Sequence, residues 1–235
     1  MAEANGRDRR KLWFALWFVL GVALVIGYAW RTLSNPPAPE PVAAIVTPDA
    51  PVTPGAAPAG VPEVAPIEHP LLEITIEGEA NGRVVVELFP ELAPEHVRRL
   101  VTLADRGAYD GVVFHRVIDG FMAQTGDVQF GRIGEDMSRA GTGASDLPDL
   151  PAEFSNYPYG TGVVGMARGT GVNTANSQFF ITFAPAEFLN GKYTVVGKVV
   201  EGMDVVEAIK RGTGNNGAVI GKPDVMTRVR VLDGG

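Results

Sequence analysis

Cysteine is absent from this sequence, and its absence excludes several classes of function. A chain without thiols forms no disulfide, offers no thiolate nucleophile and builds no zinc–thiolate site. Histidine is scarce as well, because only His69, His96 and His115 occur and no two of them stand at the spacing of metal ligands. We therefore expect a protein that uses neither a catalytic metal nor a cofactor.

Clustered positive charge is also lacking beyond the first dozen residues. The 235 residues carry a formal net charge of −7, whereas a surface that binds nucleic acid needs grouped Lys and Arg side chains to neutralise phosphates. No serine lies in a G-x-S-x-G turn, a common setting of a hydrolase nucleophile. These absences argue against nucleic acid as a partner and against nucleophilic hydrolysis.

Two glycine-rich segments, residues 160–165 and 212–217, match the G-x-G-x-x-G spelling of dinucleotide-binding loops. Such a loop binds a pyrophosphate between a strand and a helix of a parallel unit, with an acidic residue at the end of the following strand. Neither segment has that setting, so we expect no nucleotide ligand. The chain contains 29 glycines, and chance matches of this kind arise easily in it.

The chain does contain one long uncharged apolar run, residues 12–30, which predicts a transmembrane helix. At about 1.5 Å per helical residue, the run nearly crosses a hydrocarbon layer of about 30 Å. Trp13 and Trp17 lie near one end and Trp30 lies at the other, as expected for aromatic side chains at membrane interfaces. A buried helix of a soluble protein rarely lacks a polar face altogether.

The basic residues near this run lie almost entirely on its N-terminal side. Four precede it: Arg7, Arg9, Arg10 and Lys11. Arg31 follows it, and no further Lys or Arg occurs before Arg83. The positive-inside rule therefore predicts that residues 1–11 are cytoplasmic and that the rest of the chain lies across the membrane. A cleaved signal peptide is the alternative, because residues 27–29 form a passable cleavage site, and cleavage would leave a soluble periplasmic protein.

Residues 31–68 are predicted to form a linker. Eleven of the chain's 18 prolines fall between Pro36 and Pro70, among Ala, Val, Thr and Gly, and no hydrophobic periodicity is present there. Proline removes backbone donors and fixes φ, so neither a helix nor a sheet can propagate. We expect a semi-rigid spacer with polyproline II character.

Residues 69–235 are predicted to form one folded, mainly β domain. Its many short β-rich runs and two helical segments indicate an antiparallel β-barrel capped by the helices. Proline at the start and Gly107 at the end delimit the first helix. The predicted elements are hairpin strands over 71–78 and 82–89, a strand over 112–118, helices over Pro94–Arg106 and Asp204–Arg211, and a last strand over Thr227–Leu232.

Seven segments of this domain together resemble the cyclophilins, a family of peptidyl-prolyl cis-trans isomerases, in the family's order. They are Phe114–Ile118, Gly120–Asp127, Gly141–Gly143, Gly165–Arg168, Asn176–Thr182, Phe188–Lys192 and Val196–Gly197. Each segment alone would be weak, but FHRVI and FM-x-Q-x-GD followed about fifty residues later by SQFFI form a highly specific combination. The resemblance covers nearly all of residues 71–232. It implies a closed eight-stranded antiparallel β-barrel capped by two α-helices, with the active site on the barrel's outer face.

The residue types also suit the reaction that the resemblance implies. Rotation about an X–Pro bond breaks amide resonance against a barrier of about 18–20 kcal/mol, and it needs neither a nucleophile nor a metal. It needs an apolar pocket for the proline ring and a fixed donor for the prolyl nitrogen, which regains its lone pair in the twisted state. By resemblance, Arg116 is the catalytic donor, and Gln124 orients it and binds the substrate backbone.

The resemblance further assigns the substrate-binding residues: Phe121, Met122, Ala167, Asn173, Phe180, Phe188, Leu189 and Tyr193. The proline pocket is expected from Phe121, Met122, Phe180 and Leu189, and the groove from the others. Taken singly, the aromatic and Met side chains would be assigned to a core and Arg116 to a surface ion pair. Only the joint pattern favours the catalytic assignment.

The sequence departs from many eukaryotic members at two groove positions. Phe188 replaces a tryptophan whose indole N–H, by resemblance, binds the cyclic peptide inhibitor cyclosporin, and Tyr193 replaces a histidine. The stretch 128–140 is longer than in the smallest members, and Gly143 is followed by Ala144 rather than by a second glycine. These differences affect substrate preference and groove shape but leave the catalytic arginine in place.

We therefore expect a prolyl isomerase that is anchored by one helix in a bacterial inner membrane and assists protein folding on the periplasmic side. Its expected partners are proline-containing polypeptides and the membrane. The alternative is a non-catalytic proline-binding or chaperone module that uses the same groove, and the intact Arg116 and Gln124 argue against it.

Overall fold

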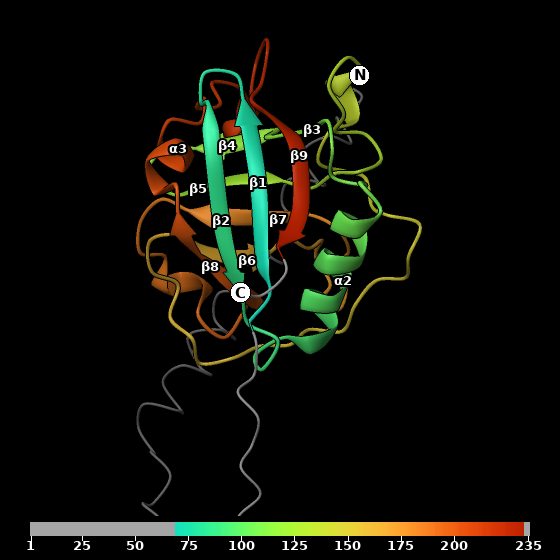
Figure 1. Cartoon of the computed structure of the whole chain (residues 1–235), viewed down its shortest axis with the longest axis vertical. Coiled ribbons are helices and arrows are strands. Elements are labelled where there is room, and N and C mark those ends of the chain that lie inside the picture. The colour runs from blue at the N-terminus through green and yellow to red at the C-terminus, as the bar shows by residue number, and fades with distance from the viewer. Residues whose placement is uncertain (1–68, 233–235) are drawn as a thin grey trace, which may run out of the picture. The chain divides into compact units, whose positions relative to one another are not determined.

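A computed structural model describes residues 69–232, which form a curled antiparallel β-sheet with two α-helices (Figure 1). The strands are β1 (Leu71–Glu77), β2 (Gly82–Leu88), β3 (Val112–Val113), β4 (Arg116–Ile118), β5 (Met122–Thr125), β6 (Val163–Met166), β7 (Phe179–Thr182), β8 (Val195–Glu201) and β9 (Val225–Leu232). The helices are α2 (Pro94–Asp105) and α3 (Met203–Glu207), with 3₁₀ turns η1 (Met137–Arg139), η2 (Glu187–Leu189) and η3 (Asn215–Gly217).

The predicted N-terminal parts of the chain, residues 1–11, 12–30 and 31–68, lie outside the described residues. Within residues 69–232, no helix is both long enough and apolar enough to span a membrane.

Strands β1 and β2 form the predicted hairpin, with Leu71 opposite Glu87 at its open end. Side chains alternate along a strand, and on β1 this alternation buries Leu72, Ile74 and Ile76 in the core. Branched apolar residues pack well on such a half-buried pleated surface. The hairpin prediction is therefore confirmed, and the hairpin is determined by residues that lie close together in the sequence.

The nine strands of residues 69–232 belong to one sheet, in the order β3-β9-β1-β2-β8-β6-β7-β5-β4. The two edge strands, β3 and β4, are consecutive in the chain and are separated only by Phe114 and His115. The sheet therefore curls until both of its edges reach the same segment.

The expected closed barrel of eight strands is corrected in two respects. The run 112–118, predicted as one strand, is divided, because β3 pairs with β9 whereas β4 pairs with β5. Counting these pieces separately gives nine strands instead of eight. Within residues 69–232 no ladder of hydrogen bonds joins β3 to β4. The sheet is therefore curled but is not closed into a barrel.

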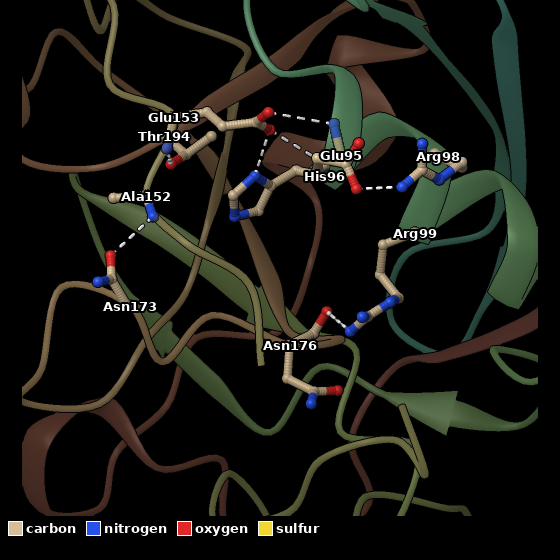
Figure 2. Close-up of polar contacts among 9 residues, drawn as sticks. All are labelled: Glu95, His96, Arg98, Arg99, Ala152, Glu153, Asn173, Asn176 and Thr194. Atoms are coloured by element: carbon tan, nitrogen blue, oxygen red, sulfur yellow. Dashed lines mark hydrogen bonds and ion pairs between the residues drawn. The ribbon is translucent and has the colours of Figure 1, made fainter. Parts of the chain in front are cut away.

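Helix α2 begins at Pro94, as predicted, and a distant carboxylate caps its first turn. Glu153 accepts hydrogen bonds from the backbone N–H groups of Glu95 at 3.2 Å and His96 at 3.1 Å, and from Nδ1 of His96 at 2.6 Å (Figure 2). A negative group is favourable there, because the first N–H groups of a helix lack partners within it. The helix ends ahead of Gly107, whose φ of 63° lies in the left-handed region.

Helix α3 is shorter than predicted, because it covers Met203–Glu207 rather than Asp204–Arg211. Beyond it, the buried carboxylate of Asp224 accepts hydrogen bonds from the backbone N–H groups of Lys210 at 2.7 Å and Ala80 at 2.8 Å. This contact ties the segment after the helix to the hairpin and turns it away from the helical path.

The alternation of side chains produces two separate apolar clusters. On β7, Phe179 and Ile181 belong to the main core, whereas Phe180 belongs to a second cluster on the outer face of the sheet. On β5, Ala123 faces the main core and Met122 the outer cluster. The main core stabilises the fold, and the outer cluster leaves an apolar surface on which a site can form.

His115, in the break between β3 and β4, is only 7% exposed, and neither ring nitrogen has a hydrogen-bond partner among the described residues. Burial lowers the pKa of His115 to about 4, against the opposing attraction of Asp127. Unfolded histidine has a pKa of about 6.5. Between pH 6.5 and about pH 4 the unfolded chain binds a proton at His115 that the folded domain does not bind. The contribution of neutral His115 to the free energy of unfolding is therefore complete above about pH 6.5 and is lost as the pH falls towards 4.

We expect this one group to lower the free energy of unfolding by about 3 kcal/mol between neutral pH and about pH 4. Urea denaturation of residues 69–235, followed by circular dichroism at both pH values, measures the loss. The His115→Gln variant cannot titrate at this position, and its loss should be smaller by about the same amount. Equal losses in the two proteins would contradict the assignment.

Candidate active site

Strands β4, β5 and β7 bring the predicted site residues into register on the outer face of the sheet. Arg116 on β4 is paired with Gln124 on β5, and Gln124 is paired with Phe180 on β7. Met122 precedes Gln124 by two residues and so points to the same face. A cationic, an amide and an aromatic side chain therefore form one row across the sheet.

The guanidinium of Arg116 is held by two amide residues. Its Nη1 donates to Oε1 of Gln124 at 3.0 Å, while its Nε and Nη2 donate to the backbone oxygen and Oδ1 of Asn216 at 2.9 and 3.0 Å. Among residues 69–232, no carboxylate forms an ion pair with it. Partial burial lowers the pKa of Arg116, and Tyr193 opposes the shift. Arginine still remains charged in proteins, so the site holds an oriented cation without a countercharge.

A chain of hydrogen bonds continues from Gln124 away from Arg116. Nε2 of Gln124 donates to Oε1 of Gln178 at 2.9 Å, and Nε2 of Gln178 donates to the carbonyl of Gly143 at 2.8 Å. The N–H of Gly143 donates in turn to the buried carboxylate of Asp127 at 2.9 Å. Each amide side chain both accepts and donates, which fixes the acceptor atom of Gln124 towards Arg116.

Two cavities open on this face. The smaller has a volume of about 90 Å³ and is lined by Arg116, Phe121, Met122, Gln124, Ala167, Arg168, Phe180, Leu189 and Tyr193. The larger, of about 340 Å³, lies between residues 141–144 and 174–178 and has a more polar lining. Because Gln124, Ala167 and Arg168 line both cavities, the two are adjoining parts of one groove.

Aromatic packing gives the smaller cavity a rigid wall. The ring of buried Phe180 stacks at 5.9 Å on Tyr159 and meets Tyr193 edge to face at 6.0 Å between centroids. At the rim, Phe121 and Phe188 lie with their centroids 5.2 Å apart. Apolar walls with a few placed polar groups are typical of ligand sites that exist before the ligand arrives.

Eight of the ten predicted site residues line the smaller cavity; the other two are Phe188 and Asn173. Phe188 is 60% exposed at the rim. Asn173 lines neither cavity, because it lies in an exposed loop where its Oδ1 accepts a hydrogen bond from the backbone N–H of Ala152 at 2.9 Å (Figure 2).

Among the residues that were not predicted from the sequence, three lie beside Arg116 and Gln124: Arg168, Gln178 and Asn216. Arg168 lines both cavities, and its guanidinium carbon lies 4.5 Å from the centroid of the Tyr193 ring. Arg168 and Gln178 lie inside segments that carry the family resemblance, so the sequence did contain a signal for them. Asn216 offered none, because it lies 100 residues from Arg116 and reaches it only in the folded domain.

Residues 71–231 match the family described as cyclophilin type peptidyl-prolyl cis-trans isomerase/CLD. This chain belongs to the cyclophilin family. A probable peptidyl-prolyl cis-trans isomerase from Brucella suis biovar 1 (strain 1330) is 55% identical to this cyclophilin over 153 residues, which cover 64% of this chain and 78% of that protein. The peptidyl-prolyl cis-trans isomerase-like 1 of Aspergillus fumigatus is 42% identical over 130 residues, covering 54% and 74% of the two chains.

Solved cyclophilin structures share the fold. The crystal structure of cyclophilin AquaCyp293 from Hirschia baltica superposes with a TM-score of 0.55 at 26% identity, covering 68% of this chain and 72% of that one. A cyclophilin type peptidyl-prolyl cis-trans isomerase from Cryptosporidium parvum, crystallised in the presence of the dipeptide Ala-Pro, superposes with a TM-score of 0.58 at 23% identity. It covers 69% of this chain and 99% of its own, and this likeness shows the fold alone.

Isomerisation of peptidyl-prolyl bonds is thus the activity of this cyclophilin. The groove offers an oriented cation, amide groups for a peptide backbone and an apolar recess. Bond rotation needs these three groups and no covalent chemistry. Within residues 69–232, no three His, Asp or Glu side chains converge as a metal site.

Proposed function

We propose that Arg116 is the catalytic residue of this isomerase and that the smaller cavity holds the proline ring of the substrate. The observation that carries the proposal is an oriented guanidinium, without a countercharge, in the lining of an apolar recess. As the X–Pro bond twists, the prolyl nitrogen regains its lone pair, and an N–H of Arg116 donates to it. This hydrogen bond forms only in the twisted state and therefore lowers the barrier.

The other site residues bind and align the peptide in this proposal. Phe121, Met122, Phe180 and Leu189 contact the proline ring, and Gln124 holds Arg116 and the substrate backbone. Ala167, Phe188 and Tyr193 flank the peptide, whereas Asn173 acts only indirectly because its side chain is bonded to Ala152. Proline-containing polypeptides are the substrates, a choice supported by the prolyl isomerase family to which the chain belongs.

We further propose that residues 12–30 anchor the chain in a bacterial inner membrane and that the isomerase assists protein folding on the periplasmic side. The uncharged run, the basic residues before it and the proline-rich segment after it support this arrangement. The similarity to a Brucella protein supports a bacterial setting.

The proposed anchor at residues 12–30 predicts how the chain is arranged across the membrane. The full-length chain should sediment with membranes, and protease added from the periplasmic side should release an active soluble domain by cutting within residues 31–68. Immunoblotting of membrane and soluble fractions, with mass spectrometry of the released fragment, measures this. A matched variant with Leu20→Arg and Val25→Arg places two charges in the run and should leave the membrane fraction. Recovery of a soluble form of the parent that begins just after Ala29 would show a cleaved signal instead.

A further inference from the structure

We propose that Asn216 is a positioning residue that holds the guanidinium of Arg116 in the orientation isomerisation requires. The inference rests on the proposed catalytic role of Arg116 and goes beyond it by assigning a function to the loop 212–217. Asn216 accepts two hydrogen bonds from Arg116, one at its backbone oxygen from Nε at 2.9 Å and one at Oδ1 from Nη2 at 3.0 Å. A single residue thereby binds two nitrogens along one edge of a planar fork, which defines its orientation.

Asn216 adopts an unusual backbone conformation. Its φ of 54° and ψ of 30° lie in the left-handed region, and no other non-glycine residue within 69–232 has a positive φ. This region is unfavourable for a residue with a Cβ, although asparagine tolerates it better than most. Strained conformations of this kind persist where the surrounding structure enforces them, and they cluster at functional sites. Here the strained residue has both of its oxygens bonded to Arg116.

The loop that carries Asn216 is hydrogen-bonded directly to β4, the strand that carries Arg116. The N–H of Gly212 donates to the carbonyl of Val117 at 2.9 Å, and the N–H of Val219 donates to the carbonyl of His115 at 3.0 Å. These carbonyls belong to the residues immediately before and after Arg116 in the chain. The loop therefore moves with the arginine's own backbone and can set the position of its side chain.

The glycines of the loop allow this close packing. A Cβ at Gly217, whose φ is 79°, would lie 2.4 Å from Cγ1 of Ile118, and one at Gly212 would lie 1.9 Å from the oxygen of Gly217. The G-x-G-x-x-G pattern of residues 212–217, which also occurs in dinucleotide-binding loops, thus has a structural role here. The glycines let the backbone approach β4 closely enough for Asn216 to reach Arg116.

The acceptors around Arg116 are neutral, and this matters for catalysis. Asn216 and Gln124 bind three of the five N–H groups without offsetting the positive charge. A carboxylate at either position would orient the guanidinium equally well but would weaken its stabilisation of the developing lone pair. Two amides on opposite sides orient the cation and leave its charge available to the substrate.

The test compares Asn216→Gly with Asn215→Gly in the full-length chain. Glycine adopts a left-handed conformation without strain, so Asn216→Gly should fold and melt at or above the parent's temperature. Asn215 does not have a positive φ, so Asn215→Gly should fold with a slightly lower melting temperature. Asn216→Gly keeps the backbone oxygen but loses the Oδ1 acceptor, and its kcat should fall about tenfold at unchanged KM because a misdirected donor weakens only the twisted state. The side chain of Asn215 makes no hydrogen bond among the described residues, so its variant should stay within about twofold of the parent.

A double-mutant cycle separates positioning from a structural role. If Asn216 acts through Arg116, Asn216→Gly should change kcat by less than about twofold in a chain that already carries Arg116→Ala. A further tenfold fall in that background, or parental kcat of the folded single variant, would overturn the inference while leaving the role of Arg116 intact. Full activity of Arg116→Ala alone would overturn the role of Arg116 and this inference with it.

Discussion

Replacing Arg116 by alanine should lower kcat/KM for prolyl isomerisation by about two to three orders of magnitude while the domain stays folded. The removed donor acts on the prolyl nitrogen in the twisted state, so its loss raises the barrier and barely weakens binding of the ground state. The fold should survive because Arg116 lies on the outer face of β4, where its side chain bonds to Gln124 and Asn216 and belongs to neither apolar cluster.

Exchange spectroscopy on a proline-containing peptide measures the isomerisation rate, and circular dichroism reports the fold. Arg228→Ala is the matched control, because Arg228 is an exposed strand arginine on β9 that lines neither cavity of the groove. This control should keep the parental rate. A folded Arg116→Ala variant with activity within a few-fold of the parent would rule out the proposed mechanism.

Cyclosporin should inhibit this cyclophilin only weakly, and Phe188→Trp should strengthen the inhibition by about one to two orders of magnitude. Phe188 occupies the rim position where, by family resemblance, a tryptophan N–H binds the drug, and a phenyl ring has no donor. The drug's carbonyl is then desolvated without a partner, at a loss of about 1–3 kcal/mol. Catalysis should survive the substitution, because a substrate peptide does not depend on the rim donor as the drug does, and Phe188 lies outside the lining of the smaller cavity.

The absence of tryptophan from residues 69–235 makes binding directly observable. In that fragment Phe188→Trp would carry one indole, at the rim of the groove, and its fluorescence should change as the drug binds. Phe154→Trp is the matched control, since Phe154 is 41% exposed and lines neither cavity, so neither fluorescence nor inhibition should respond there. Tight inhibition of the parent, or no gain from Phe188→Trp, would show that the missing donor does not control sensitivity.

The β1–β2 hairpin and the start of α2 could be predicted because each is determined by residues that are neighbours in the sequence. The alternating branched residues of the hairpin and the proline at the start of α2 act within a few residues of themselves, and both elements form where they were predicted. The site residues carried by short strands were predicted from the family resemblance. Alternation puts Met122 and Gln124 on one face of β5. The register between strands then brings Arg116 and Phe180 to the same face, because both are paired with Gln124.

Tertiary contacts decided the features that depend on residues far apart in the sequence. The run 112–118 is divided because its halves pair with different strands, and α3 is shortened where Asp224 binds the backbone beyond it. Asn216 could not be assigned to the site from sequence, because its left-handed backbone and its two bonds to Arg116 exist only when the loop packs on β4. The sequence alone thus determined which groups could perform the chemistry, since residue type and strand periodicity are local properties. Only the tertiary structure decided how these groups are oriented, because the hydrogen bond between Arg116 and Asn216 joins residues 100 positions apart and depends on the packing of the whole domain.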